Sequence, residues 1–64
     1  MTFRVHIANG VDYEHGSVEL EARPVPGERV RVQLDSGSEV VADVDAIEVT
    51  HQLIGFDGSL DCHR

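Results

Sequence analysis

The chain has 64 residues and a formal net charge of −7, from twelve acidic and five basic side chains. A chain of this length holds one hydrophobic core, so we expect a single domain over residues 1–64. The charge argues against nucleic acids and anionic membranes as partners, because both are bound mainly through clustered Lys and Arg. It favours solubility and a basic protein partner.

Cysteine content and the N-terminal sequence bear on the compartment. Cys62 is the single cysteine, so no disulfide can form within the chain. A lone thiol, no apolar run of roughly 18 residues and no signal-peptide pattern predict a cytoplasmic protein. Small domains often gain stability from a partner subunit, which makes a homodimer one expectation.

Alternating apolar and polar residues predict β-strands along most of the chain. The first four are expected at residues 2–8, 17–23, 28–34 and about 39–45. Asn9-Gly10 is typical of a turn, and we expect a long loop over residues 9–16. Pro24–Gly27 ends the second strand, because proline cannot donate to a ladder. The residues expected to face inward are Phe3, Val5, Ile7, Val18, Leu20, Ala22, Val30, Val32, Leu34, Val40, Ala42 and Val44.

A shift in the inward-facing positions predicts a bulge or bend near Asp45-Ala46. Apolar residues occupy even positions up to Val44 and odd positions at Ile47 and Val49, as one extra residue would produce. A last strand is expected at residues 59–63, with Leu60 and Cys62 on one face. The expected fold class is therefore all-β, a small antiparallel meander of about five strands that closes into a barrel.

Charge pairing between neighbouring strands predicts two rows on the outer face of the sheet. The rows are His6, Glu19, Arg31 and Asp43, and Arg4, Glu21, Arg29 and Asp45. Three of the five arginines would then be paired, which leaves no free basic surface for phosphate. The surplus carboxylates would lie in loops and at strand ends, at Asp12, Glu14, Asp35, Glu39, Asp57 and Asp61.

Residues 24–50 contain a proline-glycine turn, a Val-x-Val strand, a tight polar turn and a second Val-rich strand. These are Pro26-Gly27, Val30-Arg31-Val32, Asp35–Ser38 and Val40-Val41. Their order resembles the Src-homology-3-like barrels of the Tudor and KOW type, and implies that the meander closes into such a barrel. The chain lacks the basic surface of an RNA-binding KOW module, and its few aromatic residues cannot form a Tudor methyl-lysine cage. The resemblance therefore implies a fold and not an activity.

Catalytic and metal-binding patterns are sparse. The candidate ligands are His6, His15, His51, His63 and Cys62. They include no Cys-x-x-Cys or His-x-x-x-His spacing, so we expect neither a metal nor another cofactor. Cys62 with His51 is the one conceivable nucleophile and base. A barrel filled by its own side chains has no room for a substrate pocket of about 300 Å³, so we expect no enzyme.

Five residues are candidates for contact with a protein partner. Tyr13 lies between Asp12 and Glu14, and an aromatic ring rimmed by carboxylates is typical of a binding hot spot. Alternatively, Tyr13 folds back over an open end of the barrel, and Phe56 presents the same choice. His51 alternates with apolar positions, which places it either at the barrel mouth in a binding role or capped by a backbone carbonyl.

The favoured hypothesis is a non-catalytic protein-interaction module that works by docking, as a homodimer or inside a larger assembly. One alternative is an acidic decoy of the kind phages encode, which occupies the basic groove of a nucleic-acid-binding protein. It is motivated by the net charge of −7 on so short a chain. The other alternative is a small metal- or thiol-dependent enzyme that uses His51 and Cys62.

Overall fold

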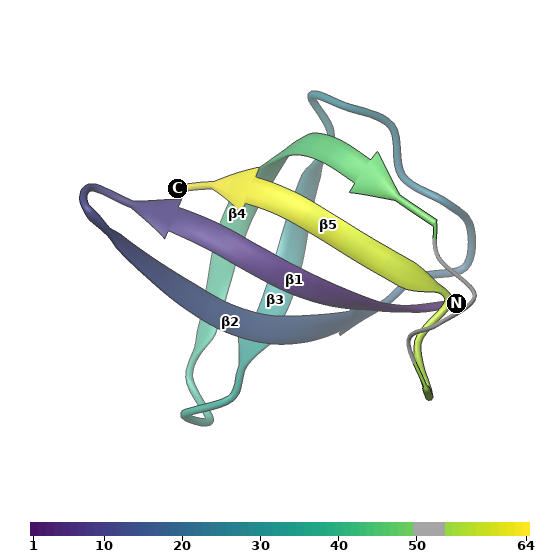
Figure 1. Cartoon of the computed structure of the whole chain (residues 1–64), viewed down its shortest axis with the longest axis horizontal. Helices are drawn as coiled ribbons and strands as arrows, with labels where there is room; N and C mark the ends of the chain where they lie inside the picture. Colours follow the sequence, from purple (N-terminus) through teal and green to yellow (C-terminus); the bar gives the residue numbers. More distant parts are fainter. Residues whose placement is uncertain (50–53) are drawn as a thin grey trace.

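Five β-strands form the regular structure of residues 1–49 and 54–64, the parts of the chain that the computed structural model describes. They are β1 (Thr2–Asn9), β2 (Asp12–Glu19), β3 (Arg29–Leu34), β4 (Glu39–Glu48) and β5 (Gly58–His63). Each strand pairs with the next, and β5 returns to β1 to close a barrel (Figure 1). The predicted all-β barrel is confirmed. The described residues include no helix long and apolar enough to cross a membrane.

The barrel closes through a parallel pair, β1 with β5. Four antiparallel steps leave the first and fifth strands pointing the same way, as the two arrows in Figure 1 show. Val5 lies opposite Leu60, and Ile7 lies opposite Cys62. All four side chains are buried, so the closing pair is also part of the core.

The barrel interior is filled by apolar side chains from all five strands. The buried set is Phe3, Val5, Ile7, Val18, Val30, Val32, Leu34, Ala42, Val44, Leu60 and Cys62. Burying one large aliphatic or aromatic side chain contributes about 1.5–3 kcal/mol, so this cluster is the main source of stability. Every predicted inward position in β1, β3 and β5 is confirmed. Ala22 is exposed and Leu20 only half-buried, because β2 has already ended at Glu19.

A bulge in β4 lies where the sequence predicts it. Val44 lies opposite Cys62 and Ala46 opposite Asp61, so the residue between them is extra. Beyond the bulge Ile47 lies opposite Leu60 and is half-buried, which confirms the change of face. Val49 does not continue this pattern, because it follows the end of β4 and is 52% exposed.

The first hairpin is tighter than predicted. Asn9 pairs with Asp12 across a two-residue turn, and Gly10 has the positive φ of 66° that such turns require. The predicted loop over residues 9–16 is therefore wrong, because most of it belongs to β2. His6 consequently lies opposite His15 and not Glu19.

The two predicted rows of alternating charge are also wrong. Arg29 lies opposite Asp43, two residues from its predicted partner, and Arg31 lies opposite Val41. Arg4 lies opposite Ser17, and Glu21 lies beyond the end of β2. Turn geometry sets hairpin register, and exposed ion pairs worth about 0–1 kcal/mol each are too weak to override it.

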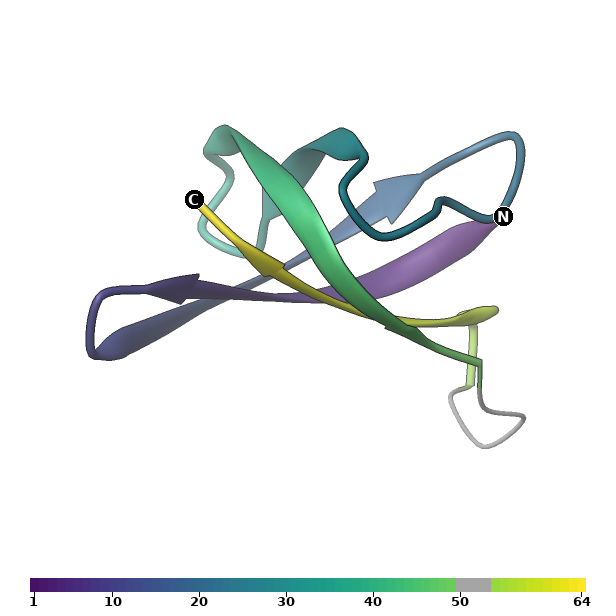
Figure 2. The ribbon, with the colours of Figure 1, turned by 90° about the horizontal axis from the view of Figure 1, so that it is seen from above.

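The ladder between β2 and β3 is the shortest in the barrel. It has the predicted register but consists of two pairs, Gly16 with Leu34 and Ser17 with Gln33. Gly16 permits this close approach, because a Cβ there would collide with the Gln33 carbonyl and lie 2.9 Å from Val32 Cγ1. Figure 2 shows β2 and β3 diverging from this crossing point.

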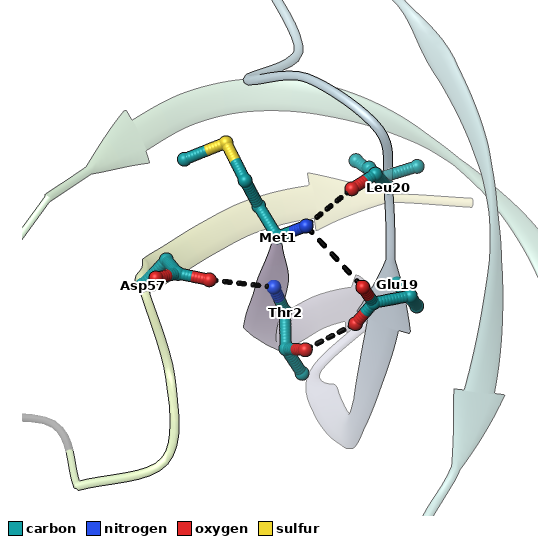
Figure 3. A network of polar contacts seen from close by, with 5 residues as sticks. All are labelled: Met1, Thr2, Glu19, Leu20 and Asp57. Atoms are coloured by element: carbon teal, nitrogen blue, oxygen red, sulfur yellow. Dashed lines mark hydrogen bonds and ion pairs between the residues drawn. The ribbon is translucent and has the colours of Figure 1, made fainter.

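The first residues of β1 are held by segments on both sides (Figure 3). The Thr2 amide donates to Asp57 Oδ2 at 2.8 Å, and the Asp57 amide donates to the Thr2 carbonyl at 2.7 Å. On the other side the Thr2 hydroxyl and the Met1 ammonium both donate to the Glu19 carboxylate. The two hydrogen bonds to its carboxylate lower the pKa of Glu19, and the bond from the Thr2 hydroxyl has the larger effect.

We expect Gly16→Ala to lower the free energy of unfolding by about 1–3 kcal/mol, because the added methyl group overpacks the β2–β3 crossing. Urea unfolding followed by circular dichroism measures this change. Ser17→Ala, at the next position of the same ladder, is the control and should have a much smaller effect. Equal stability of Gly16→Ala and the unmodified protein would contradict the close packing.

Candidate functional site

Three of the five residues predicted to contact a partner lie together at one end of the molecule. Asp12, Tyr13 and Glu14 are consecutive in β2, directly after the tight turn at the far left of Figure 1. Phe56 lies two residues before β5, whose beginning is at the other end of the molecule (Figure 1), and is half-buried. His51 lies outside the described residues. The structure therefore groups the first three and separates Phe56 from them.

The end of the β1–β2 hairpin projects beyond the other strands in both views (Figures 1 and 2). We call residues 9–14 the hairpin end. Val11 at its turn is 97% exposed, and Tyr13 is 68% exposed. Tyr13 lies opposite Ala8 on the outer face of the sheet. It does not cover an open end of the barrel, so that alternative is wrong.

A surface hollow of about 300 Å³ adjoins the hairpin end. It is lined by Glu14, His15, Leu34, Asp35 and Ser36. The prediction that the barrel has no room for a pocket of this size concerned its interior, which is filled. The hollow is outside, at the corner where β3 ends and the chain turns toward β4. Nothing in the sequence indicated it, because it depends on where β3 leaves β2.

Two arginines hold the carboxylates that line this hollow. Both terminal nitrogens of Arg4 donate hydrogen bonds to the Asp35 carboxylate, at 2.9 and 2.7 Å. Arg64 Nη1 donates to Glu14 Oε1 at 2.8 Å. The hydrogen bonds from Arg4 lower the pKa of Asp35, so this carboxyl stays ionised to lower pH than an ordinary aspartate. Neither ion pair is visible in the sequence, because each joins segments that only the closed barrel brings together.

We expect Asp35→Asn to be less stable than the unmodified protein at pH 7, with the difference vanishing in acid. A lowered folded-state pKa stabilises the fold above the unfolded value of about 3.9, and this stabilisation is lost as pH falls through the folded pKa. Urea unfolding at pH 7 and near pH 2 measures the difference.

The matched control is Asp12→Asn, which removes the same charge from a carboxylate without an ion pair in the described part of the chain. It should not reproduce the loss of stability at pH 7. An Asp35→Asn difference that persists unchanged in acid would show that the charge of Asp35 is not its cause.

The described histidines lie in two separate places. His6 and His15 contact edge to face, with ring centroids 4.9 Å apart and planes at 89°, so neither has its predicted role as a partner of Glu19 or as a loop residue. His63 Nδ1 lies 2.7 Å from Asp45 Oδ1, and this hydrogen bond raises the pKa of His63. That contact stabilises the fold below the ordinary histidine pKa and is lost as pH rises through the raised value.

The remaining candidates from the sequence are a metal site and a reactive Cys62 thiol. Residues 1–49 and 54–64 contain no group of three or more side chains arranged to hold a metal ion. Cys62 is buried, and burial, followed by the charges of Asp45, Asp61 and Asp43, raises its pKa to about 11. A thiol with this pKa is protonated at neutral pH and is a poor nucleophile.

No protein-family model, curated protein or solved structure matches the chain. The resemblance of residues 24–50 to Tudor and KOW barrels stays a prediction.

Proposed function

We propose that this chain is a non-catalytic protein-binding module that docks through the hairpin end. The supporting observation is the exposure of Tyr13 and Val11, 68% and 97%, on a projecting and regularly paired strand end. An exposed tyrosine on a rigid support offers a large contact area and loses little conformational entropy on binding. Asp12 precedes Tyr13 in β2 and points to the other face of the strand, where it adds negative charge to the same hairpin end.

The distribution of arginine supports a protein rather than a nucleic acid as partner. Arg4, Arg29, Arg31 and Arg64 each pair with a carboxylate. Arg23 is the one arginine without an ion pair in the described residues. Nucleic-acid binding depends on several basic side chains free to neutralise phosphates. The net charge of −7 favours a partner that carries lysine or arginine.

The single buried thiol is consistent with a cytoplasmic location. The filled interior of the barrel supports docking over catalysis. A substrate site normally encloses most of its ligand. Here the hollow lies on the surface, and the buried thiol is protonated at neutral pH. A homodimer through the hairpin end is the competing form of the same docking role.

An acidic decoy for a nucleic-acid-binding protein is the second candidate, and a different surface favours it. The outer face of β4 and β5 carries four carboxylates. Asp43 pairs with Arg29 and Asp45 contacts His63, whereas Glu48 and Asp61 have no ion pair in the described residues. A row of carboxylates along neighbouring strands matches a basic groove in charge. Such binding would depend on this face and would weaken steeply with salt.

The test uses the double variant Val11→Ser, Tyr13→Ser. Proteins captured from the source cells by the unmodified chain are identified, and calorimetry then measures the affinity of each purified partner. Losing a hot-spot residue costs about 2 kcal/mol or more, so we expect affinity to fall roughly 30-fold. Val41→Ser, a change to an exposed valine on β4, is the control and should bind normally.

Several outcomes would contradict the proposal. An affinity unchanged in the double variant shows that the hairpin end does not dock. Binding that is instead lost in Asp45→Asn, Asp61→Asn and in high salt supports the decoy. A chain that captures no protein and scatters light as a monomer has no docking role.

A further inference from the structure

The outer edge of β2 has no backbone partner at the hairpin end within the described residues. The Asp35 amide donates to the His15 carbonyl at 3.0 Å, and beyond this bond the chain turns away toward β4. In an antiparallel ladder, alternate residues direct their amide and carbonyl groups to the same neighbour. The groups of Tyr13, two residues before His15, therefore point to the side that β3 has left.

The neighbours of Tyr13 bond in the other direction. Asp12 lies opposite Asn9, and Glu14 lies opposite Ile7, which places their amide and carbonyl groups toward β1. The hydrogen bonds of the barrel therefore do not use the Tyr13 amide. An unpaired strand edge of this kind is a ready template for another extended segment.

The hollow occupies the space where β3 would have continued. One wall belongs to β2, at Glu14 and His15, and the other to the end of β3 and its turn, at Leu34, Asp35 and Ser36. A segment laid along β2 in line with β3 would place its backbone in this space and direct its side chains alternately to the two faces of the sheet. Both carboxylates in its lining are already paired, Glu14 with Arg64 and Asp35 with Arg4, so the hollow supplies room for the backbone of a segment rather than a free charge.

The two faces of this edge differ in chemistry. Asp12 and Glu14 share one face, and Tyr13 lies on the other, because side chains alternate along a strand. Cross-strand pairs of opposite charge or with an aromatic ring are each worth about 0.2–1 kcal/mol. Glu14 is paired with Arg64, whereas Asp12 has no ion pair in the described residues. The edge therefore favours a segment with a basic side chain opposite Asp12 and apolar side chains on the face of Tyr13.

Charge disfavours a second copy of the chain as the occupant. Two copies can pair their β2 edges antiparallel, with the same face of each strand on the same side of the joint sheet. Such a pair has a two-fold axis through one residue position, and the residue at that position lies opposite its own copy. Centred on Asp12 or Glu14, the pairing places that carboxylate opposite its own copy. Centred on Tyr13, it places Asp12 opposite Glu14. Like charges directly opposite each other destabilise a strand pair.

We infer that the hairpin end binds its partner by strand addition. An extended segment of another protein, alternating basic and apolar residues, pairs with the free edge of β2 in the space that the hollow leaves open. This inference rests on the proposed docking role of the hairpin end and specifies how the partner is held.

A defined peptide tests the inference on the unmodified protein. The probe is a six-residue peptide of alternating lysine and valine with blocked ends, and the control has the same composition arranged as three lysines followed by three valines. Amide hydrogen exchange is followed by NMR. With saturating probe, exchange of the Tyr13 amide should slow at least tenfold, whereas the Glu14 amide, already paired with β1, should change little.

Two substitutions at position 13 separate backbone pairing from side-chain contact. Tyr13→Pro removes an amide that the barrel does not use, and proline is tolerated at such edge positions. Tyr13→Ala keeps the amide and removes the ring. We expect the proline variant to lose binding to the alternating peptide and the alanine variant to lose only part of its affinity. Retained cooperative unfolding checks the fold, and the exchange measurement decides alone if Tyr13→Pro does not fold.

The outcomes distinguish this inference from the docking role. Peptide binding with unchanged exchange at Tyr13, or equal losses in the two variants, overturns strand addition and leaves docking through side chains. No binding of the alternating peptide, or equal binding of the block control, also overturns it. Slower exchange at Tyr13 that follows protein concentration identifies a second copy as the occupant. The docking role itself fails if the Val11→Ser, Tyr13→Ser variant binds captured partners normally, or if the chain captures no protein and is a monomer.

Discussion

Closure of the barrel depends on the pairing of β1 with β5, the strands farthest apart in the chain. Phe3, Val5 and Ile7 are fully buried only because Leu60 and Cys62 lie beside them on the parallel partner. The bonds of Thr2 to Asp57 and to Glu19 anchor the beginning of β1 to both neighbouring segments (Figure 3). The strands β2, β3 and β4 complete the core of the closed barrel. The end of the β1–β2 hairpin projects from this barrel.

The candidate site follows from a mismatch in strand length around this body. The two-residue turn after Asn9 lets β2 begin well before its contact with β3 at Gly16. β3 ends at Leu34, so part of β2 has a neighbour on one side only. The exposed ring, the free edge and the hollow share this origin. A longer β3 would have covered the edge, and a longer turn would have removed the regular pairing that supports it.

The sequence predicted which residues face inward better than which residues face each other. Hydrophobic alternation depends on the strand alone, and it identified most of the core and the bulge before Ala46. Register depends on turns, and interpreting Asn9-Gly10 as the start of a loop displaced the first hairpin by four residues. Asp12, Tyr13 and Glu14 were selected by their residue types. Their place on a free strand edge could follow only from the observed register and from the point where β3 ends.

The carboxylates of the hairpin end also bear on colloidal behaviour. An exposed strand edge is a common starting point for aggregation, and charged residues along it are one way in which proteins prevent copies from stacking. Here Asp12 and Glu14 supply that protection, in a chain whose net charge of −7 adds general repulsion.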